Sequence, residues 1–289
     1  GGHPNQDVSM YVAASVSELL LDPSKCPHEQ WLLHLDAAFL PRPTAPSSLP
    51  GDEMSSKRLQ LTANRMGLTL PTVPLPRAEF DSLAFSEEEI EAEAIRLQAA
   101  IQQHQRWPIE TCRSIAPLTL EINRLKNEND VFLIAHTYQT PDIIYGVADE
   151  VADSYTLSKS ARDAPQQTIL FSSVRFMAET AKIVSPHKTV LHPSPEAGCS
   201  LSDGITAQDV LDLRAKYPGV PVACYINTTA AVKAECDVSV TSSNYMRICE
   251  RLPGDRLIFV PDRFMGAHLQ TALAGKKEVI VYDGECEVH

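Results

Sequence analysis

An internal repeat of about 88 residues constrains this chain more than any other feature of its sequence. The tripeptide Arg175-Phe176-Met177 recurs as Arg263-Phe264-Met265, 88 residues later. Each tripeptide follows a short apolar run and opens a helical stretch. Downstream, each copy carries a lysine, another apolar run and one cysteine: Lys188 and Cys199 in the first, Lys277 and Cys286 in the second. A fixed period of this kind indicates a repeated structural unit.

The segments upstream of the tripeptides align at nearly the same offset. His136-Thr137-Tyr138 ends one apolar run, and Tyr225-Ile226-Asn227 ends its counterpart 89 residues later. Asp153-Ser154 corresponds to Thr241-Ser242 at an offset of 88. Because these features recur in one order at offsets of 87 to 89, we interpret them as the duplication of one unit.

Short apolar runs that alternate with helical stretches predict the fold class. A polar helix is expected over residues 118–127, and the apolar runs that follow it occupy residues 131–134, 168–171, 189–191, 220–226, 238–240, 257–260 and 279–281. Runs rich in Val, Ile and Leu are typical of parallel strands covered on both faces. We therefore expect an α/β protein of repeated αβα domains. The expected division is an N-terminal extension over 1–110, a first repeat over 111–198 and a second over 199–289.

The N-terminal extension has a different character. Residues 1–110 hold 11 of the 21 prolines, and the stretches at 41–50 and 70–77 are typical of linkers or exposed loops. One short helix is expected at 12–21. A stronger one is expected from Ser86, because Ser86 and Glu89 fit a capping box. We find no candidate chemistry in this extension.

Polar side chains recur at the predicted carboxyl ends of the strands. They are His136, Tyr138, Ser154, Cys199, Tyr225, Asn227, Ser242 and Cys286. In open α/β sheets ligands bind at these ends, and following helix N-termini favour anions. Singly, each residue has an ordinary structural role, as when serine caps a helix. Their matched placement indicates one shared cavity, whereas Cys112, Cys224, Cys236 and Cys249 have no repeat partner and are interpreted as structural.

Composition narrows the functional classes. The formal net charge of −12 argues against a broad nucleic-acid-binding surface. No apolar run reaches the ~18 residues of a membrane span. The seven cysteines include no CxxC pair and no signal peptide precedes them, so we expect a reducing, cytoplasmic setting. The first residue, Gly1, and the last, His289, lead us to expect a fragment.

Several of these segments together resemble one enzyme family over residues 115–289. They are Ile134-Ala135-His136-Thr137-Tyr138-Gln139, Ala152-Asp153-Ser154, Arg175-Phe176-Met177-Ala178-Glu179-Thr180-Ala181-Lys182, Ala197-Gly198-Cys199-Ser200-Leu201, Tyr225-Ile226-Asn227-Thr228-Thr229, Val240-Thr241-Ser242-Ser243, Pro261-Asp262-Arg263 and Gly284-Glu285-Cys286-Glu287-Val288-His289. The chain resembles quinolinate synthase, the iron–sulfur enzyme of de novo NAD biosynthesis. The resemblance implies three α/β domains around a pseudo-threefold axis, each giving one cysteine to a central [4Fe–4S] cluster. Cys199 and Cys286 then correspond to the first two ligands, and the third is expected beyond the C-terminus.

The resemblance also implies an activity for the complete enzyme. It condenses iminoaspartate with dihydroxyacetone phosphate to quinolinate, and the open iron of the cluster acts as a Lewis acid. His136, Tyr138 and Tyr225 correspond to catalytic groups, with acid and base not distinguished. His136, Ser154, Tyr225, Asn227 and Ser242 correspond to substrate-binding groups. L-Aspartate oxidase is the implied functional neighbour, and a fragment with two of the three domains is expected to be inactive alone.

Two other functions compete with this interpretation. One is another cluster-dependent hydro-lyase, such as an aconitase-type enzyme; those enzymes space two cysteines closely, unlike this chain. The other is a non-catalytic α/β protein that binds small anions and whose cysteines are inert. The second alternative predicts no bound iron.

Overall fold

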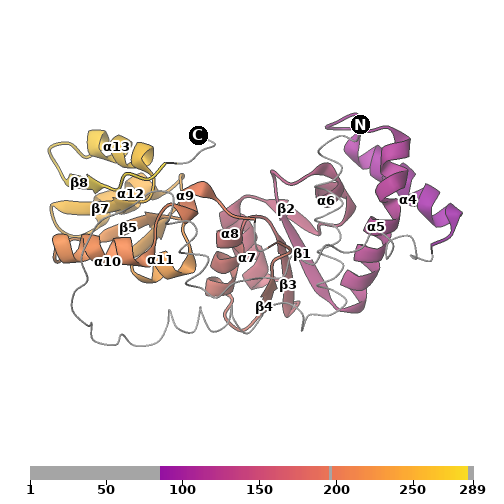
Figure 1. Cartoon of the computed structure of the whole chain (residues 1–289), viewed down its shortest axis with the longest axis horizontal. Coiled ribbons are helices and arrows are strands. Elements are labelled where there is room, and N and C mark those ends of the chain that lie inside the picture. The colour runs from indigo at the N-terminus through magenta and orange to yellow at the C-terminus, as the bar shows by residue number, and fades with distance from the viewer. Residues whose placement is uncertain (1–84, 195–196, 286–289) are drawn as a thin grey trace, which may run out of the picture.

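Two parallel four-stranded sheets, each covered by helices on both faces, form the framework of the protein (Figure 1). The computed structural model describes residues 85–194 and 197–285. Among these residues, none of the helices combines the length and the apolar character that a membrane span requires. The helix expected at 12–21, the proline-rich stretches at 41–50 and 70–77, and Cys286 lie outside the described residues.

The two sheets share one topology. The first contains β1 (Val131–His136), β2 (Glu150–Ala152), β3 (Thr168–Ser172) and β4 (Thr189–Leu191). The second contains β5 (Val222–Tyr225), β6 (Val238–Val240), β7 (Arg256–Val260) and β8 (Glu278–Val281). Their strand orders are β2-β1-β3-β4 and β6-β5-β7-β8, and neighbouring strands are parallel throughout. The α/β class is therefore confirmed, and both units follow the same chain path, as the repeat predicts.

All seven predicted apolar runs lie in or across strands, but β2 was not predicted. Its segment Glu150–Ala152 has three residues, all only partly buried. Such a strand gives no apolar run in the sequence. It forms because the chain after α6 returns alongside β1, where Ile134 pairs with Glu150 and His136 pairs with Ala152.

The helices complete each unit as three layers. Residues 87–184 form α4 (Glu87–Ile101), α5 (Ile109–Glu128), α6 (Pro141–Gly146), α7 (Ser154–Asp163) and α8 (Arg175–Val184). Residues 200–272 form α9 (Ser200–Asp203), α10 (Ala207–Lys216), α11 (Ala230–Ala234), α12 (Tyr245–Arg251) and α13 (Arg263–Ala272). The helices α5 and α6 pack on one face of the first sheet, with α7 and α8 on the other. In the second unit, α10 and α11 take the place of α5 and α6, and α12 and α13 take the place of α7 and α8.

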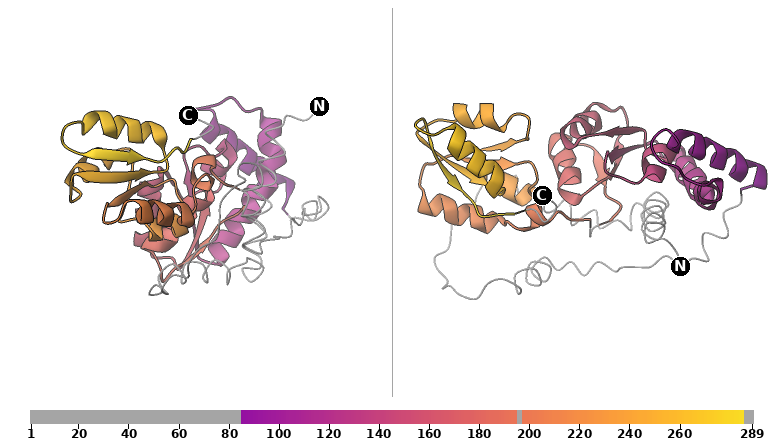
Figure 2. Two further views of the ribbon diagram at one scale, coloured as in Figure 1. Left: turned by 60° about the vertical axis from the view of Figure 1, so that its left-hand side comes forward. Right: turned by 90° about the horizontal axis from the view of Figure 1, so that it is seen from above.

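The helix expected from Ser86 is present with its capping box. The Ser86 hydroxyl accepts the N–H of Glu89, and the Glu89 carboxylate accepts the N–H of Ser86. The next helix begins earlier than predicted, at Ile109 instead of Leu118. The extra turns form because residues of α5 such as Cys112 and Ala116 bury an apolar face against α4. Helix α4 packs against α5 at the outer end of the first unit, as the right-hand view of Figure 2 shows.

A buried polar cluster ties the first sheet to α5. The Asp149 carboxylate accepts hydrogen bonds from the N–H of Leu133 (2.8 Å) and from Lys126 Nζ (2.8 Å). The same ammonium donates to the Val147 carbonyl at 2.8 Å. The cluster thereby fixes the loop before β2 onto the start of β1.

The second unit repeats this cluster. The Asp237 carboxylate accepts the N–H of Val222 (2.7 Å) and a guanidinium N–H of Arg214 (2.8 Å). The Nε of Arg214 donates to the Glu235 carbonyl at 2.8 Å. Each member lies 88 or 89 residues after its counterpart in the first unit. Equivalent hydrogen bonds from equivalent positions are stronger support for a duplication than the recurrence of a tripeptide.

Removal of the buried ammonium should be costly, whereas removal of an exposed one should not. The Lys126 side chain is 9% exposed and its partner Asp149 is 33% exposed. We expect Lys126→Met to lower the free energy of unfolding by about 2 kcal/mol, because a partly buried carboxylate and the Val147 carbonyl lose their donor. The matched control is Lys276→Met, which breaks the surface pair with Glu250 and should have little effect. Urea unfolding measures both; equal losses in the two variants would contradict the expectation.

Candidate functional site

The carboxyl end of β1 carries the best-defined part of the candidate site. His136 ends the strand, and its imidazole lies against the Tyr138 ring with 4.1 Å between the ring centroids. The Tyr138 hydroxyl accepts the N–H of Val174 (2.8 Å) at the start of α8, and it lies 3.9 Å from the Met177 sulfur. The two predicted residues therefore form one group, held between β1 and α8.

Burial keeps both of these side chains neutral near pH 7. It lowers the pKa of His136, and the Asp153 carboxylate opposes this only in part. It raises the pKa of Tyr138 to about 12, with hydrogen bonds from Val174 and Ser173 opposing the shift. Tyr138 is 51% exposed overall, so we attribute its shift to the hydroxyl end, which is the end in contact with α8. A neutral imidazole can accept a proton, and a phenol can donate one.

Cys199 lies on the same side of the first unit. It is the N-cap residue of α9, and its N–H donates to the Asp203 carboxylate at 3.2 Å. The loop is held on α8, because the N–H of Arg175 donates to the Ala197 carbonyl at 2.8 Å. Cys199 is a partly exposed residue, packs against the core on that side of the first sheet, and is an electrostatic neighbour of Tyr138. The structure thus brings His136, Tyr138 and Cys199 together.

The two predicted serines occupy the matching turns after β2 and β6. Ser154 is the first residue of α7, but Asp153 caps this helix by accepting the N–H groups of Tyr155 and Thr156. Ser242 lies in the turn before α12, where Asn244 is the N-cap residue. The capping role that is common for serine is therefore filled by Asp153 at α7, whereas α12 has no side-chain cap, since the Asn244 side chain accepts the N–H of Thr241 instead.

Tyr225 and Asn227 lie in the second unit where His136 and Tyr138 lie in the first. Tyr225 ends β5 and is partly buried, and its carbonyl accepts the Thr228 hydroxyl at 3.0 Å. The Lys233 ammonium holds the following loop by donating to the carbonyls of Ile226 (2.8 Å) and Thr228. The loop that carries Asn227 is therefore fixed at the carboxyl end of the second sheet.

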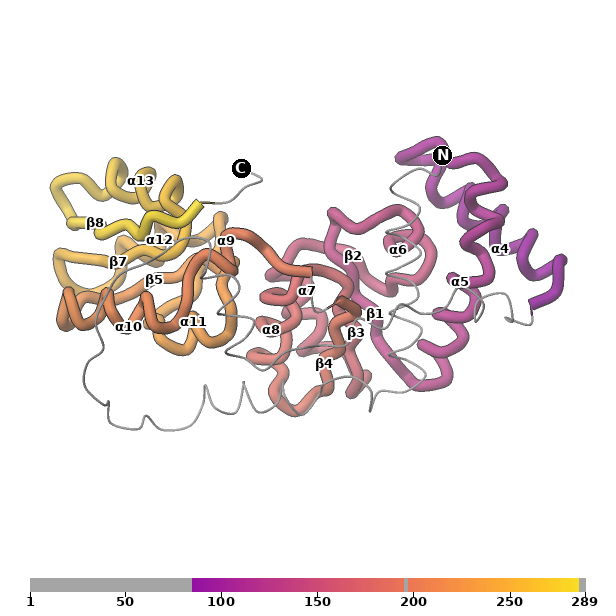
Figure 3. Tube along the Cα trace, in the orientation of Figure 1, coloured from indigo at the N-terminus to yellow at the C-terminus, as the bar shows by residue number. Residues whose placement is uncertain are grey.

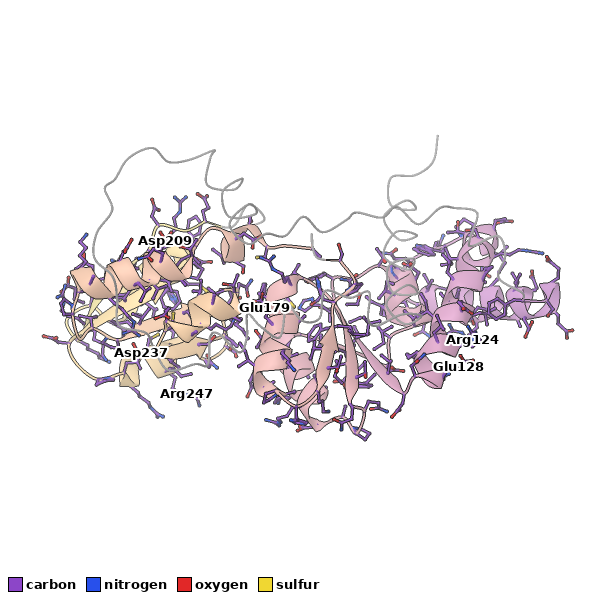
Figure 4. All side chains as sticks on the ribbon, turned by 60° about the horizontal axis from the view of Figure 1, so that its bottom comes forward. Arg124, Glu128, Glu179, Asp209, Asp237 and Arg247 are labelled. Atoms are coloured by element: carbon purple, nitrogen blue, oxygen red, sulfur yellow. The ribbon has the colours of Figure 1, made fainter. Side chains whose placement is uncertain are left out.

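The junction between the two units is built by a residue that the sequence analysis named only within the segment 175–182 of the family resemblance. Glu179 lies on α8, and Figure 4 shows it where the first unit meets the second. Its carboxylate accepts the N–H of Ala230 at the start of α11 (2.6 Å), and burial raises its pKa. The Lys233 ammonium lies 5.6 Å from the Phe176 ring centroid across the same junction. Figure 3 follows the chain from one unit to the other, with α9 beside this junction.

Comparison with known proteins assigns a family to this arrangement. A protein-family model described as Quinolinate synthetase A protein matches residues 120–289, more than half of the chain. The chain belongs to this family. The quinolinate synthase of Mycobacterium sp. (strain KMS) is 50% identical over 170 residues, which cover 58% of this chain and 50% of the relative. That of Caulobacter vibrioides (strain NA1000 / CB15N) is 42% identical over 208 residues, covering 70% and 55%.

A third relative shows the same partial coverage. The quinolinate synthase of Clostridioides difficile (strain 630) is 45% identical over 172 residues, covering 60% of this chain and 56% of the relative. The chain spans about half the length of the curated relatives that it matches. The region matched by the quinolinate synthetase A model includes all eight candidate residues and excludes α4.

Within the described residues, no three side chains of His, Cys, Asp or Glu are grouped to hold a metal ion. Cys286 lies outside those residues, and only Cys199 of the two predicted cluster ligands is placed. Sequence reasoning also missed Ser173 and the buried His192, whose Nε2 lies 2.8 Å from the Ser173 carbonyl. No repeat partner marks either residue, and only the fold brings Ser173 next to Tyr138 and His192 next to Ser173.

Proposed function

We propose that this chain is part of a quinolinate synthase that condenses iminoaspartate with dihydroxyacetone phosphate to give quinolinate, phosphate and water. The observation that carries the proposal is the neutral pair His136 and Tyr138 beside Cys199, within the region that matches the family. Acid–base groups next to a thiol fit an enzyme that moves protons beside a thiolate-bound cofactor. An inert anion-binding protein has no need of that combination.

We further propose that Cys199 and Cys286 hold two irons of a [4Fe–4S] cluster and that a third cysteine belongs to a further copy of the unit. Cys199 fits this role, since it is partly exposed at the start of α9, whereas Cys112 and Cys249 are fully buried in core clusters. When bound, such a cluster supplies a Lewis-acidic iron with a position open to substrate, which favours the loss of a hydroxyl as water.

The side chains of this chain would bind the substrates and move protons. His136, as a neutral imidazole, is suited to accept a proton, and the Tyr138 phenol to donate one. Ser154 would bind a carboxylate or phosphate oxygen through its hydroxyl, since it is the first residue of α7 and Asp153, not Ser154, caps that helix. Tyr225, Asn227 and Ser242 hold equivalent positions in the second unit and would contact substrate from that side.

The exposed Phe264 supports a further copy of the unit. Its counterpart in the first unit, Phe176, is 3% exposed, because α11 and Lys233 of the second unit cover it. Phe264 is 52% exposed at the equivalent position of α13. We propose that a third copy covers Phe264 as the second covers Phe176, and that the repeats are the units 111–198 and 199–289.

The proposed reaction also implies a functionally linked enzyme and a cellular compartment. Iminoaspartate must come from oxidation of the aspartate amine, so we propose L-aspartate oxidase as the functional neighbour. We propose a reducing cytoplasmic compartment, supported by the five described cysteines, all of which are free thiols. Small molecules, and neither nucleic acid nor membrane, are the proposed ligands.

Anaerobic assays of two chains test the proposed activity. A longer protein that contains this sequence and a further cysteine-bearing unit is expected to form quinolinate and to bind about four irons and four sulfides. These 289 residues alone are expected to form no quinolinate. A longer protein that is folded and iron-free, yet binds small dicarboxylates, would overturn the proposal in favour of an anion-binding protein.

A further inference from the structure

Glu179 of α8 has no part in the proposed chemistry, yet it contacts the second unit directly. Its Oε2 accepts the N–H of Ala230, the first residue of α11, at 2.6 Å, and its Oε1 lies 3.8 Å from Arg175 Nε. The Glu179 side chain is only 13% exposed. Burial of a carboxylate is costly, so a packing contact between two helices is more cheaply made with apolar side chains.

The repeat shows that the fold itself does not require this carboxylate. Ala267 of α13 occupies the position of Glu179, 88 residues later. Lys233 of α11, which lies across the junction over the Phe176 ring, likewise has an apolar counterpart in Ile144 of α6, 89 residues earlier. Because the same chain path forms without either charge, we infer that both charges serve the junction between the two units.

Helix α8 contacts the candidate site of the first unit as well as the second unit. At its start, the N–H of the N-cap residue Val174 donates to the Tyr138 hydroxyl at 2.8 Å. Glu179 follows five residues later, which corresponds to roughly 7.5 Å along the helix axis. The backbone hydrogen bonds of this ten-residue helix fix the separation between the two contacts.

The loop after β5 connects the contact at Ala230 to a proposed substrate-binding residue. Lys233 donates to the carbonyls of Ile226 (2.8 Å) and Thr228, which are the two neighbours of Asn227. Ala230 follows Asn227 by three residues. The contact with α8 therefore holds the far end of the short loop that carries Asn227.

We propose that Glu179 is a positioning residue, which holds the loop of Asn227 at a fixed place relative to His136 and Tyr138. This role rests on the proposed quinolinate synthase function, because it requires residues of both units to contact one substrate. Glu179 itself would not touch the substrate. Its loss would leave the loop free to shift, and a displacement of about 1 Å in a substrate-contacting group is enough to cost ~100-fold in rate.

Three substitutions at Glu179 test this role in a longer protein that contains this sequence and a third unit. Glu179→Ala removes the acceptor for the Ala230 N–H, and Glu179→Asp keeps the charge but shortens its reach. Glu179→Gln keeps an oxygen acceptor at the original reach. We expect the first two to raise the KM for substrate by about 10–100-fold, the loss typical of a residue that orients an active group, with iron content unchanged. The third should restore a KM close to that of the wild type.

The matched control is Glu93→Ala. Glu93 is 7% exposed on α4 and accepts the Thr119 hydroxyl at 2.6 Å, at the outer end of the first unit. This control should lower stability and leave the KM unchanged, since a smaller folded fraction lowers the rate but not the KM of the folded enzyme. A wild-type KM in both Glu179→Ala and Glu179→Asp, or an equal rise in the control, would overturn the positioning role.

Hydrogen exchange in the same proteins separates the positioning contact from the proposed reaction. Peptides from residues 226–234 should exchange faster in Glu179→Asp than in the wild type, whereas peptides from 131–136 should be unaffected. Unchanged exchange over 226–234, or an equal increase in both regions, would overturn the role of Glu179 even if quinolinate is formed. A wild-type protein that forms no quinolinate would instead overturn the proposed function, and the exchange over 226–234 would still decide whether Glu179 holds the loop.

Discussion

If the proposed cluster is correct, replacement of Cys199 by serine in a longer protein with a third cysteine-bearing unit is expected to abolish cluster binding and quinolinate formation together. A serine hydroxyl is a poor ligand for iron at neutral pH, and a cluster with three protein ligands does not tolerate loss of one. Since replacement of even an outer-shell partner costs ~10–100-fold, we expect activity to fall by more than about 100-fold. Iron and sulfide content after anaerobic reconstitution, with quinolinate formation, measures the effect.

The matched control for this substitution is Cys112→Ser. Cys112 is fully buried between α4 and α5, in a cluster separate from the one that contacts Cys199. We expect this control to lower stability and to leave the iron content per folded protein unchanged. A Cys199→Ser protein that retains the full iron and sulfide content would contradict the ligand assignment, even if its activity were lost.

The repeat made most of the fold predictable. Its offset aligned β1 with β5 and β3 with β7, and the structure gives both units one strand order. The capping box at Ser86 was predictable because Ser86 and Glu89 interact through local hydrogen bonds. The local sequence pattern did not predict the first turns of α5, because these turns are stabilised by packing against α4 and carry no sequence signal of their own.

The candidate site was predictable only in part. The grouping of His136 with Tyr138 follows from their spacing after β1, and the structure shows it. The contact of Glu179 with Ala230 joins residues 51 positions apart on different units, so no local pattern could reveal it. The Asp149 and Asp237 clusters could have been found by reading the repeat further, because their members share the offset of 88. The convergence of both units on one cavity stays a prediction.

His192 should make the protein lose stability in mild acid. This residue follows β4, its Nε2 lies 2.8 Å from the Ser173 carbonyl, and burial lowers its pKa from 6.5 to about 4. Between these two values the unfolded chain binds a proton that the folded protein does not, so stability is full above pH 6.5 and falls as the pH drops towards 4. At about 1.4 kcal/mol per pKa unit, the expected loss is about 3 kcal/mol.

Urea unfolding between pH 7 and pH 4 measures this loss, and a variant isolates it from other groups. Carboxylates such as Asp153, whose pKa is lowered by hydrogen bonds from Thr156 and Tyr155, lose their contribution at more acid pH. Glu179 acts in the opposite direction, because a raised pKa favours the folded state on acidification.

The variant His192→Asn keeps a donor for the Ser173 carbonyl but cannot titrate. It should therefore flatten the dependence of the unfolding free energy on pH between 6.5 and 4, whereas substitution of the exposed His187 should not. A slope that is the same in all three proteins would show that His192 is not the group responsible.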